Sequence, residues 1–376
     1  MNYDLNEEQI MLKNTVRKFL AEVCNGDFIK EMKQDAKGYT EDLWKKMAEL
    51  GWMCILIPEE YDGIGGSVLD MAVLMHEIGY SCLPGPFFST AVVGAIALIE
   101  AGSEAQKKAI LPEVASGERK LSLAWLEEEG LNSARGIHLT TRKEGGEYVL
   151  NGTKLFVKDV HVADTIIVVA RTPESIGEEG ITLLLVDGKA SGLSVNPLRV
   201  TSGEKLSEVV FNQVRVPEGN VLGAPNQGWA VFKKIMLKCA VLKSAEMSGG
   251  AKKVLEFATA YAKERVQFGR PFGAFQAIAH HCANIWTEVD TSNLLMYQAA
   301  WRISAGLDYE REAVICKAYV SDSYRRLLKL GAQVLGGTGF CEEHDFHLYC
   351  QRGKASELDF GDSDFYRELW AQEMGL

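Results

Sequence analysis

The sequence predicts a mainly α-helical protein with a central β domain. Three observations indicate this order. Apolar residues recur at helical spacing from residue 6 to about residue 117, short β-branched runs separated by turns begin near residue 121, and helical spacing returns after residue 228. We therefore expect an N-terminal helical domain over residues 1–120, a middle β domain over 121–224 and a C-terminal helical domain over 225–376.

The first domain is expected to contain several helices. Asn6 and Thr40 precede apolar-periodic segments and are typical N-cap residues, because a short polar side chain can accept a hydrogen bond from the first helical turn. Residues 83–90 contain two prolines and interrupt the pattern before a further helix. The apolar positions of three helices lie at residues 10–20, 43–50 and 71–78.

The middle domain is expected to be built from short strands. The adjacent residues Asn151 and Gly152 predict a tight hairpin turn, since both residue types tolerate a left-handed backbone. Strand-like runs lie at residues 148–150, 165–170, 181–186 and 209–211. In the last domain, long helices are expected at residues 229–264, 272–305 and 309–332.

Composition limits the class of protein. The chain has 376 residues and 47% hydrophobic residues, which is enough for a large core in two or three domains. A net charge of −11 argues against nucleic acid or an anionic membrane as the main partner. A small anionic ligand would need only a local basic pocket.

The sequence predicts a cytoplasmic protein without membrane insertion. Its first residues are acidic where a signal peptide is basic, and its longest apolar run, residues 91–99, is too short to span a bilayer. Eight cysteines are scattered without CxxC pairs, which predicts reduced core thiols. We expect no metal site, because the histidine pairs lack carboxylate or thiolate neighbours at ligand spacing.

The segment 261–276 carries the strongest signal for a ligand. Arg265 at a predicted helix end offers a fork of donors that suits a pyrophosphate. Gly269 and Gly273 allow close approach of the backbone to a ligand. With its Phe-Gly turn, proline and Gln276, this segment closely resembles the flavin-binding signature of acyl-CoA dehydrogenases.

Further motifs extend the resemblance to that family over essentially the whole chain. Residues 148–156 are similar to its second-hairpin motif, 214–223 to the exit from its β domain, and 333–340 to a loop that reaches the FAD of a neighbouring subunit. The family fold is an N-terminal helical bundle, a β barrel or sandwich, and a C-terminal four-helix bundle. The resemblance implies FAD, an acyl-CoA substrate, electron-transfer flavoprotein as acceptor, and a homo- or hetero-tetramer.

The resemblance also assigns cofactor residues. FAD would contact Arg265, Gln267, Phe268 and Gln276 of one subunit and Gln333, Gly336 and Gly337 of another. Phe156 matches an aromatic residue that packs beside the flavin. Lys158 stands near the position of a hydroxyl directed at flavin N5, and it points either to the ring or to solvent. The stretch 126–134 departs from the Thr-Glu-Pro and Gly-Ser-Asp pattern of relatives and lacks their hydroxyl partner.

The catalytic base is the largest departure. Relatives use a glutamate to remove the proton α to the thioester carbonyl, but here Phe360 occupies the usual slot and Cys239 the alternative one. Asp359, Asp362 and Glu246 are candidate substitutes, although each also suits an ordinary surface or capping acid.

Two further readings of this departure stay open. In one, the chain is a non-catalytic partner subunit of a hetero-oligomer. In the other, it catalyses elimination or decarboxylation without net oxidation. The tail from residue 353 resembles a branch of the family that often acts on cyclic, steroid-derived or dicarboxylic acyl-CoA compounds, which favours a bulky acyl group.

Overall fold

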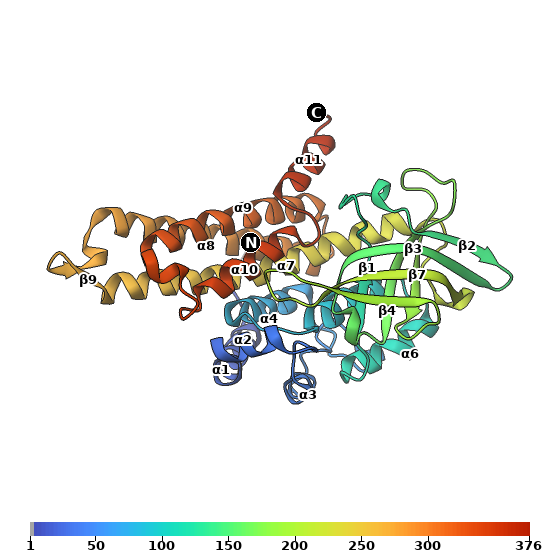
Figure 1. Cartoon of the computed structure of the whole chain (residues 1–376), viewed down its shortest axis with the longest axis horizontal. Coiled ribbons are helices and arrows are strands. Elements are labelled where there is room, and N and C mark those ends of the chain that lie inside the picture. The colour runs from blue at the N-terminus through green and yellow to red at the C-terminus, as the bar shows by residue number, and fades with distance from the viewer. Residues whose placement is uncertain (1–3) are drawn as a thin grey trace. The chain divides into compact units, whose positions relative to one another are not determined.

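A computed structural model describes residues 4–376, and the predicted order of helices, strands and helices along the chain is confirmed (Figure 1). The helices are α1 (Glu7–Val23), α2 (Gly26–Gln34), α3 (Glu41–Glu49), α4 (Val68–Ser81), α5 (Ala95–Ala101), α6 (Glu104–Ala115), α7 (Gly228–Glu264), α8 (Gln276–Ser304), α9 (Glu310–Leu335), α10 (Phe346–Leu358) and α11 (Ser363–Glu373). The strands are β1 (Leu121–Ala124), β2 (Thr140–Glu144), β3 (Glu147–Lys158), β4 (Thr165–Arg171), β5 (Ile181–Asp187), β6 (Leu193–Leu198), β7 (Leu206–Pro217), β8 (Val221–Leu222), β9 (Val266–Gln267) and β10 (Arg270–Pro271).

The chain forms two compact units. One unit contains the described residues up to Glu31, together with Val68–Leu83 and Ala240–Leu376, and we call it the bundle unit. The other contains Met32–Ser67 and Pro84–Cys239, and we call it the sheet unit. The units therefore interleave along the chain, whereas the three predicted domains follow one another. The predicted domain boundaries, at residues 120 and 224, stay a prediction made from the sequence.

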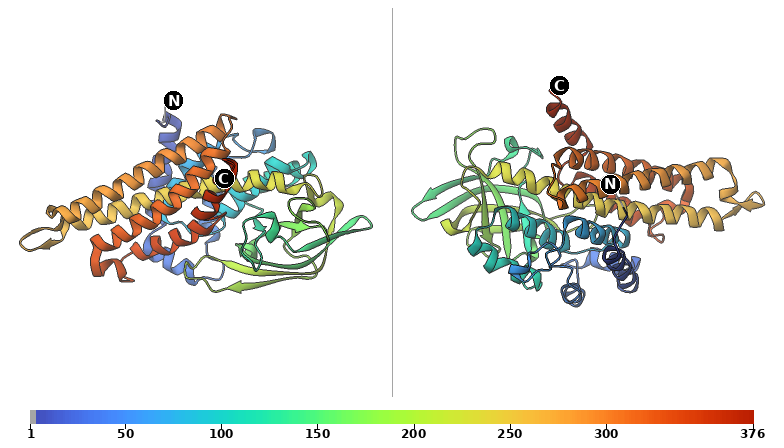
Figure 2. Two further views of the ribbon diagram at one scale, coloured as in Figure 1. Left: turned by 90° about the horizontal axis from the view of Figure 1, so that it is seen from above. Right: turned by 180° about the vertical axis from the view of Figure 1, so that it is seen from behind.

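The bundle unit is built from long helices. Helix α8 pairs with α9, which also contacts α10 and α11, while α4 contacts α1 and α8. Figure 2 shows α8 and α9 running side by side with the C-terminal part of α7. The end of α7, the start of α8 and the end of α9 lie at the same end of the bundle, near β9 (Figure 1). Buried apolar positions at helical spacing, such as Ile285, Val289 and Met296 on α8, form the core.

The sheet unit contains one eight-stranded sheet in the order β6-β7-β3-β2-β4-β5-β8, with β1 pairing in parallel with β4. Alternate residues of several strands form a single apolar core, because successive side chains of a strand point to opposite faces. This core includes Leu150 on β3, Val168 on β4, Leu184 on β5 and Phe211 on β7.

Local sequence signals gave the helix starts correctly but not the hairpin. Asn6 accepts a hydrogen bond from the backbone of Gln9 at 2.8 Å, and Thr40 caps α3, as predicted. The prediction of a turn at Asn151 and Gly152 was wrong, because both residues lie within β3. Gly152 has φ +142° in a β-bulge, and a Cβ there would lie 2.9 Å from the backbone of Leu139.

The cysteines are free thiols, as expected, and five of the eight are buried. In the described part of the chain, no helix has the length and apolarity needed to cross a membrane. Within residues 4–376, no group of three or more His, Cys, Asp or Glu side chains is arranged to hold a metal ion.

Candidate functional site

Helix α7 directs buried polar side chains into the bundle unit. Lys243 and Glu246 follow Cys239 by four and seven residues, so the three lie on one face of the helix. All three are buried, and the side chain of Lys243 has no exposed surface. A buried ammonium is costly unless it is paired with hydrogen-bonding partners. Its partners therefore identify a polar cluster inside the unit.

The partners of Lys243 form a chain of alternating charges. Arg352 on α10 donates from Nε to Glu246 Oε1 at 2.6 Å. Lys243 donates from Nζ to Glu246 Oε2, also at 2.6 Å, and lies 3.4 Å from Asp359 Oδ2. The order is thus Arg352, Glu246, Lys243, Asp359, and we call these four residues the charge chain. It links two of the three predicted base candidates, although 113 positions separate Glu246 from Asp359.

The three candidate carboxylates differ in their surroundings. Glu246 is 2% exposed and is held between two cations. Asp362 accepts a hydrogen bond from Phe365 N at 2.9 Å and caps α11, which is the ordinary capping role. Asp359 is 23% exposed and terminates the charge chain. Asp359 is therefore the candidate that combines a partly exposed side chain with a place at the end of the charge chain.

A second buried lysine fixes the turn that carries Asp359. Lys317 on α9 is completely buried, and burial lowers its pKa to about 8, an effect opposed by the nearby carboxylate of Asp359. Phe360 has φ +60°, an uncommon backbone conformation for a bulky residue, and its carbonyl accepts a hydrogen bond from the Tyr366 hydroxyl at 2.7 Å. The Lys317 ammonium donates to the carbonyls of Glu357 at 2.8 Å, Gly361 at 2.8 Å and Ser356 at 3.3 Å.

Sequence reasoning missed Lys243, Lys317 and Arg352. Lys317 is a single lysine in a small or apolar stretch of a long helix, and Lys243 stands in a similar stretch together with Glu246. That pattern indicates burial, and burial of a lysine indicates a partner. Glu246 lies three residues after Lys243 on the same helix, but Asp359 and the carbonyls bound by Lys317 lie far along the chain, so these contacts could not be identified.

The predicted FAD residues of the bundle unit gather at one end of it. The hairpin of β9 and β10 turns at Phe268, which is 89% exposed with φ +52°. Phe340, beyond the end of α9, is 79% exposed. We call the segments 265–276 and 333–340, at the ends of α7 and α9 and the start of α8, the bundle tip (Figure 1); they include Arg265, Gln267, Phe268, Gln276, Gln333, Gly336, Gly337 and Phe340. Because both predicted sets lie at one end, a single chain could supply both.

The bundle tip fits a dinucleotide with a pyrophosphate. The backbone of Arg265 is fixed by hydrogen bonds to Tyr261 O at 2.9 Å and from Phe272 N at 2.7 Å, while its side chain is exposed. Gly336 has φ +58°, and a Cβ added at Gly336 or Gly337 would meet nothing within 4 Å, so the backbone there is open to a ligand. Guanidinium, amide and open backbone donors together suit phosphate oxygens.

The predicted flavin contacts of the sheet unit lie near the end of β3. Phe156 has φ +55° at a bulge between Lys154 and Val157 and is 50% exposed, so its ring is accessible. Lys158 donates to Glu204 Oε1 at 2.8 Å. The direction of Lys158 toward the ring or toward solvent stays a prediction, and its ammonium pairs with a carboxylate on the loop between β6 and β7. This pairing reduces the field that Lys158 would exert on a flavin.

A buried ion pair organises the segment that departs from the family pattern. Glu127 accepts hydrogen bonds from the backbone of His138 and Leu139 at 3.0 Å. Lys154 donates to Glu127 at 2.6 Å and to Trp125 O at 3.0 Å. Burial lowers the pKa of Lys154 to about 8, an effect that Glu127 opposes. The segment is therefore held in place despite the missing hydroxyl.

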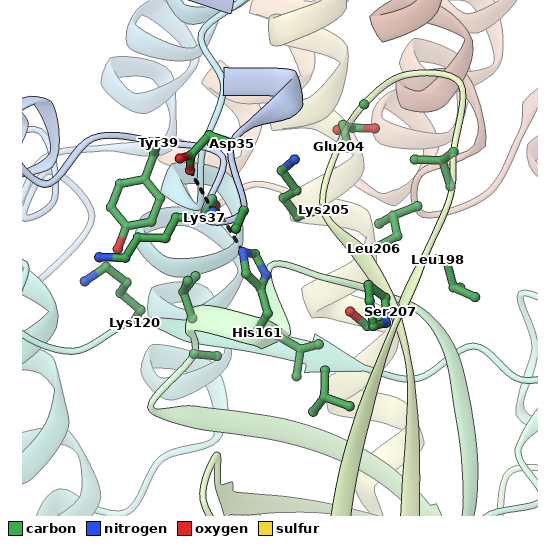
Figure 3. A pocket seen from close by; sticks show the side chains of 18 of the residues that line it. Asp35, Lys37, Tyr39, Lys120, His161, Leu198, Glu204, Lys205, Leu206 and Ser207 are labelled. Carbon is green, nitrogen blue, oxygen red and sulfur yellow. Dashed lines mark hydrogen bonds between the residues drawn. The ribbon is translucent and has the colours of Figure 1, made fainter. Parts of the chain in front are cut away.

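The sheet unit also has an open groove of about 1060 Å³ beside residues 33–41 and the β6–β7 loop (Figure 3). Its basic residues are Lys33, Lys37, Lys120, Lys189, Arg199 and Lys205, and its acidic residues are Asp35, Glu41, Glu118, Asp164 and Glu204. Glu41 pairs with Lys37 at 2.9 Å, and His161 contacts Lys37 O at 3.0 Å. The near balance of charge gives limited attraction for CoA phosphates, and the expected basic pocket remains a prediction.

Comparison with known proteins gives consistent matches along the whole chain. Sequence models of the acyl-CoA dehydrogenase N-terminal, middle and C-terminal domains match residues 6–118, 122–214 and 226–375. The probable acyl-CoA dehydrogenase YngJ of Bacillus subtilis is 31% identical, with 100% of both chains covered. Subunit CarC of the caffeyl-CoA reductase-Etf complex of Acetobacterium woodii is 28% identical, with 90% of each chain covered.

A solved structure shows the same similarity in three dimensions. Butyryl-CoA dehydrogenase from Megasphaera elsdenii superposes with a TM-score of 0.92, at 25% identity and with 100% of both chains covered. The predicted fold class, helical ends around a central β domain, is thereby confirmed.

Proposed function

The chain belongs to the acyl-CoA dehydrogenase family, and we propose that it oxidises the Cα–Cβ bond of an acyl-CoA thioester with Asp359 as the base. As a member of this family it is a flavoprotein oxidoreductase acting on CH–CH bonds, with FAD as its cofactor. The observation that carries the proposed base is the environment of Asp359. It is the partly exposed end of the charge chain, on a turn whose backbone is fixed by Lys317.

The proposed reaction removes two electrons from the acyl group. The Asp359 carboxylate would accept the proton from Cα, and FAD, held by the bundle tip, would supply the acceptor for the two electrons that leave when the Cα–Cβ bond becomes a double bond. Asp359 must be ionised to accept the proton, and the ammonium of Lys243 at 3.4 Å favours that state.

The bundle tip supports an oligomer that shares its FAD sites. Phe268 and Phe340 are large apolar side chains with most of their surface exposed. Such surfaces typically mark contacts with another protein or a ligand. We propose that the bundle tip of one chain and Phe156 of a neighbouring chain enclose one FAD, within a tetramer built from dimers.

The electron acceptor and the acyl group are proposed from relatives. The related CarC is part of a complex with Etf, which supports electron-transfer flavoprotein as the acceptor here. The tail from residue 353 supports a cyclic or otherwise bulky acyl group. A cytoplasmic location stays a prediction.

Purification of the chain alone tests the proposed function. We expect a yellow protein with stoichiometric FAD whose flavin absorbance bleaches without oxygen when a suitable acyl-CoA is added. The measurement is a visible spectrum during titration with straight-chain, cyclic and dicarboxylic acyl-CoA thioesters.

Two other outcomes would replace this proposal. A colourless protein that gains activity only with a second polypeptide would indicate a partner subunit of a hetero-oligomer. A yellow protein that forms product without any electron acceptor would indicate elimination or decarboxylation. Both alternatives are consistent with Phe360 and Cys239 in the usual base slots.

Replacing Arg265 by Ala should weaken FAD binding by roughly ten- to one-hundred-fold, because charge-assisted hydrogen bonds to phosphate contribute about 1.5–3 kcal/mol. The flavin content after gel filtration and the dissociation constant from fluorescence titration measure this change. Arg270→Ala is the matched control, since the Arg270 guanidinium lies 4.1 Å from the Phe275 ring centroid and is already engaged. Unchanged flavin content in Arg265→Ala would remove Arg265 from the site.

A further inference from the structure

We propose that Glu246 and Lys243 act as positioning residues that set the basicity of Asp359 through the charge chain. This inference rests on the proposed function, in which Asp359 is the base. Glu246 then takes no proton from the substrate. Its role is to weaken, through its negative charge, the electrostatic effect of the Lys243 ammonium on Asp359.

The geometry makes Lys243 common to both carboxylates. Its ammonium lies 2.6 Å from Glu246 Oε2 and 3.4 Å from Asp359 Oδ2. The shorter contact is with the carboxylate that is 2% exposed, and the longer one is with the carboxylate that is 23% exposed. Lys243 is therefore bound mainly by Glu246, while Asp359 keeps a surface from which it can reach a substrate.

Electrostatics give the two neighbours opposite effects on Asp359. A cation 3.4 Å away stabilises the ionised carboxylate and makes it a weaker base. A carboxylate behind that cation partly cancels this effect, because interactions between buried charges are poorly screened. Arg352 at 2.6 Å in turn stabilises the charge of Glu246, so that Glu246 stays ionised when Asp359 is protonated.

Other charged groups near Asp359 lie on several elements, but they are not linked to it through Lys243. Lys317 on α9 is fixed by backbone carbonyls, and Arg325 on α9 lies 3.6 Å from Glu357. The charged groups around this turn are Lys243 and Glu246 on α7, Lys317 and Arg325 on α9, Arg352 and Glu357 on α10, and Asp362 at the start of α11.

The test is the pH profile of kcat/KM in the FAD-loaded protein, because its acid limb reports the ionisation of the base in the free enzyme. Lys243→Met removes the cation, so the acid limb should move to higher pH by about one to three pH units. Glu246→Gln leaves the cation uncompensated, so the acid limb should move to lower pH, with a lower rate at the plateau. Lys243→Arg keeps the charge and should leave the limb near its original position.

Glu288→Gln is the matched control. It removes another ion pair of the bundle unit, between Glu288 and Arg326 at 2.7 Å, and should leave the acid limb in place. Variants are compared when they retain FAD and when their thermal unfolding midpoint lies within a few degrees of that of the wild type. A purely structural role for Glu246 and Lys243 would lower activity without moving the limb in opposite directions.

The outcomes separate this inference from the proposed function. Acid limbs that stay fixed, or that move in the same direction in Lys243→Met and Glu246→Gln, would overturn the inference even if Asp359→Asn is inactive. Full activity of Asp359→Asn would overturn the base assignment instead. A wild-type protein that is not reduced by any acyl-CoA would contradict the proposed function itself.

Discussion

Replacing Asp359 by Asn is expected to lower kcat by about 10²- to 10⁴-fold, because a positioned general base contributes about that much to a proton transfer. The amide has nearly the same shape as the carboxylate but cannot accept the α-proton. It also leaves Lys243 with Glu246 as its main partner, so the fold should persist. Steady-state turnover with an artificial electron acceptor, together with the rate of flavin bleaching in a single turnover, measures the effect.

Asp362→Asn is the control for this substitution. Asp362 is three residues away, and its side chain caps α11 by accepting from Phe365 N at 2.9 Å. Asn is as good an N-cap as Asp, so this variant changes the local charge while preserving the cap. We expect its turnover to stay within about two-fold of the wild type. Normal turnover in Asp359→Asn would contradict the assignment of the base.

Replacing Lys317 by Met should destabilise the protein by on the order of 3 kcal/mol or more, because buried acceptors without partners cost about 1–3 kcal/mol each. The Lys317 ammonium donates to three carbonyls of the turn at residues 356–361, and Lys317 is completely buried. The turn should then lose its fixed geometry, and activity should fall with it. The denaturation midpoint in urea and the flavin content measure the change.

Lys354→Met is the matched control for Lys317. Lys354 lies on α10, its side chain is 62% exposed, and its ammonium lies 3.2 Å from Glu357 Oε2. An exposed ion pair contributes about 0–1 kcal/mol, so this variant should unfold close to the wild type. Equal midpoints for both variants would show that Lys317 does not fix the turn.

The sequence predicted the local elements well because their causes are local. Helix α7 was expected at residues 229–264 and runs over Gly228–Glu264, and Asn6 and Thr40 cap the helices that they precede. A helix is determined by apolar spacing and by caps within a few residues of each end. The prediction of a turn at Asn151 and Gly152 was wrong because the cause of the observed bulge is not local. A bulge depends on the neighbouring strands β2 and β7, which the local sequence does not specify.

The candidate site was only partly predictable. Asp359, Asp362 and Glu246 were all named as possible bases, but the sequence gave no ground for choosing among them. The choice depends on Lys243, Arg352 and Lys317, whose contacts join α7, α9 and α10. Apart from the Lys243–Glu246 pair on α7, these contacts join residues far apart in the sequence, and no spacing rule relates such residues.

By itself, the sequence determined the order of helices and strands, and it predicted a flavin-binding motif around Arg265 and a departure from relatives at Phe360. These features depend on residue type and short-range spacing. Only the tertiary structure decided that Glu246 is enclosed by two cations, that Asp362 is a cap and that Asp359 ends a chain of charges with part of its surface exposed. The physical reason is that burial and the distance between charges determine what a carboxylate can do, and both are set by the packing of helices distant in sequence.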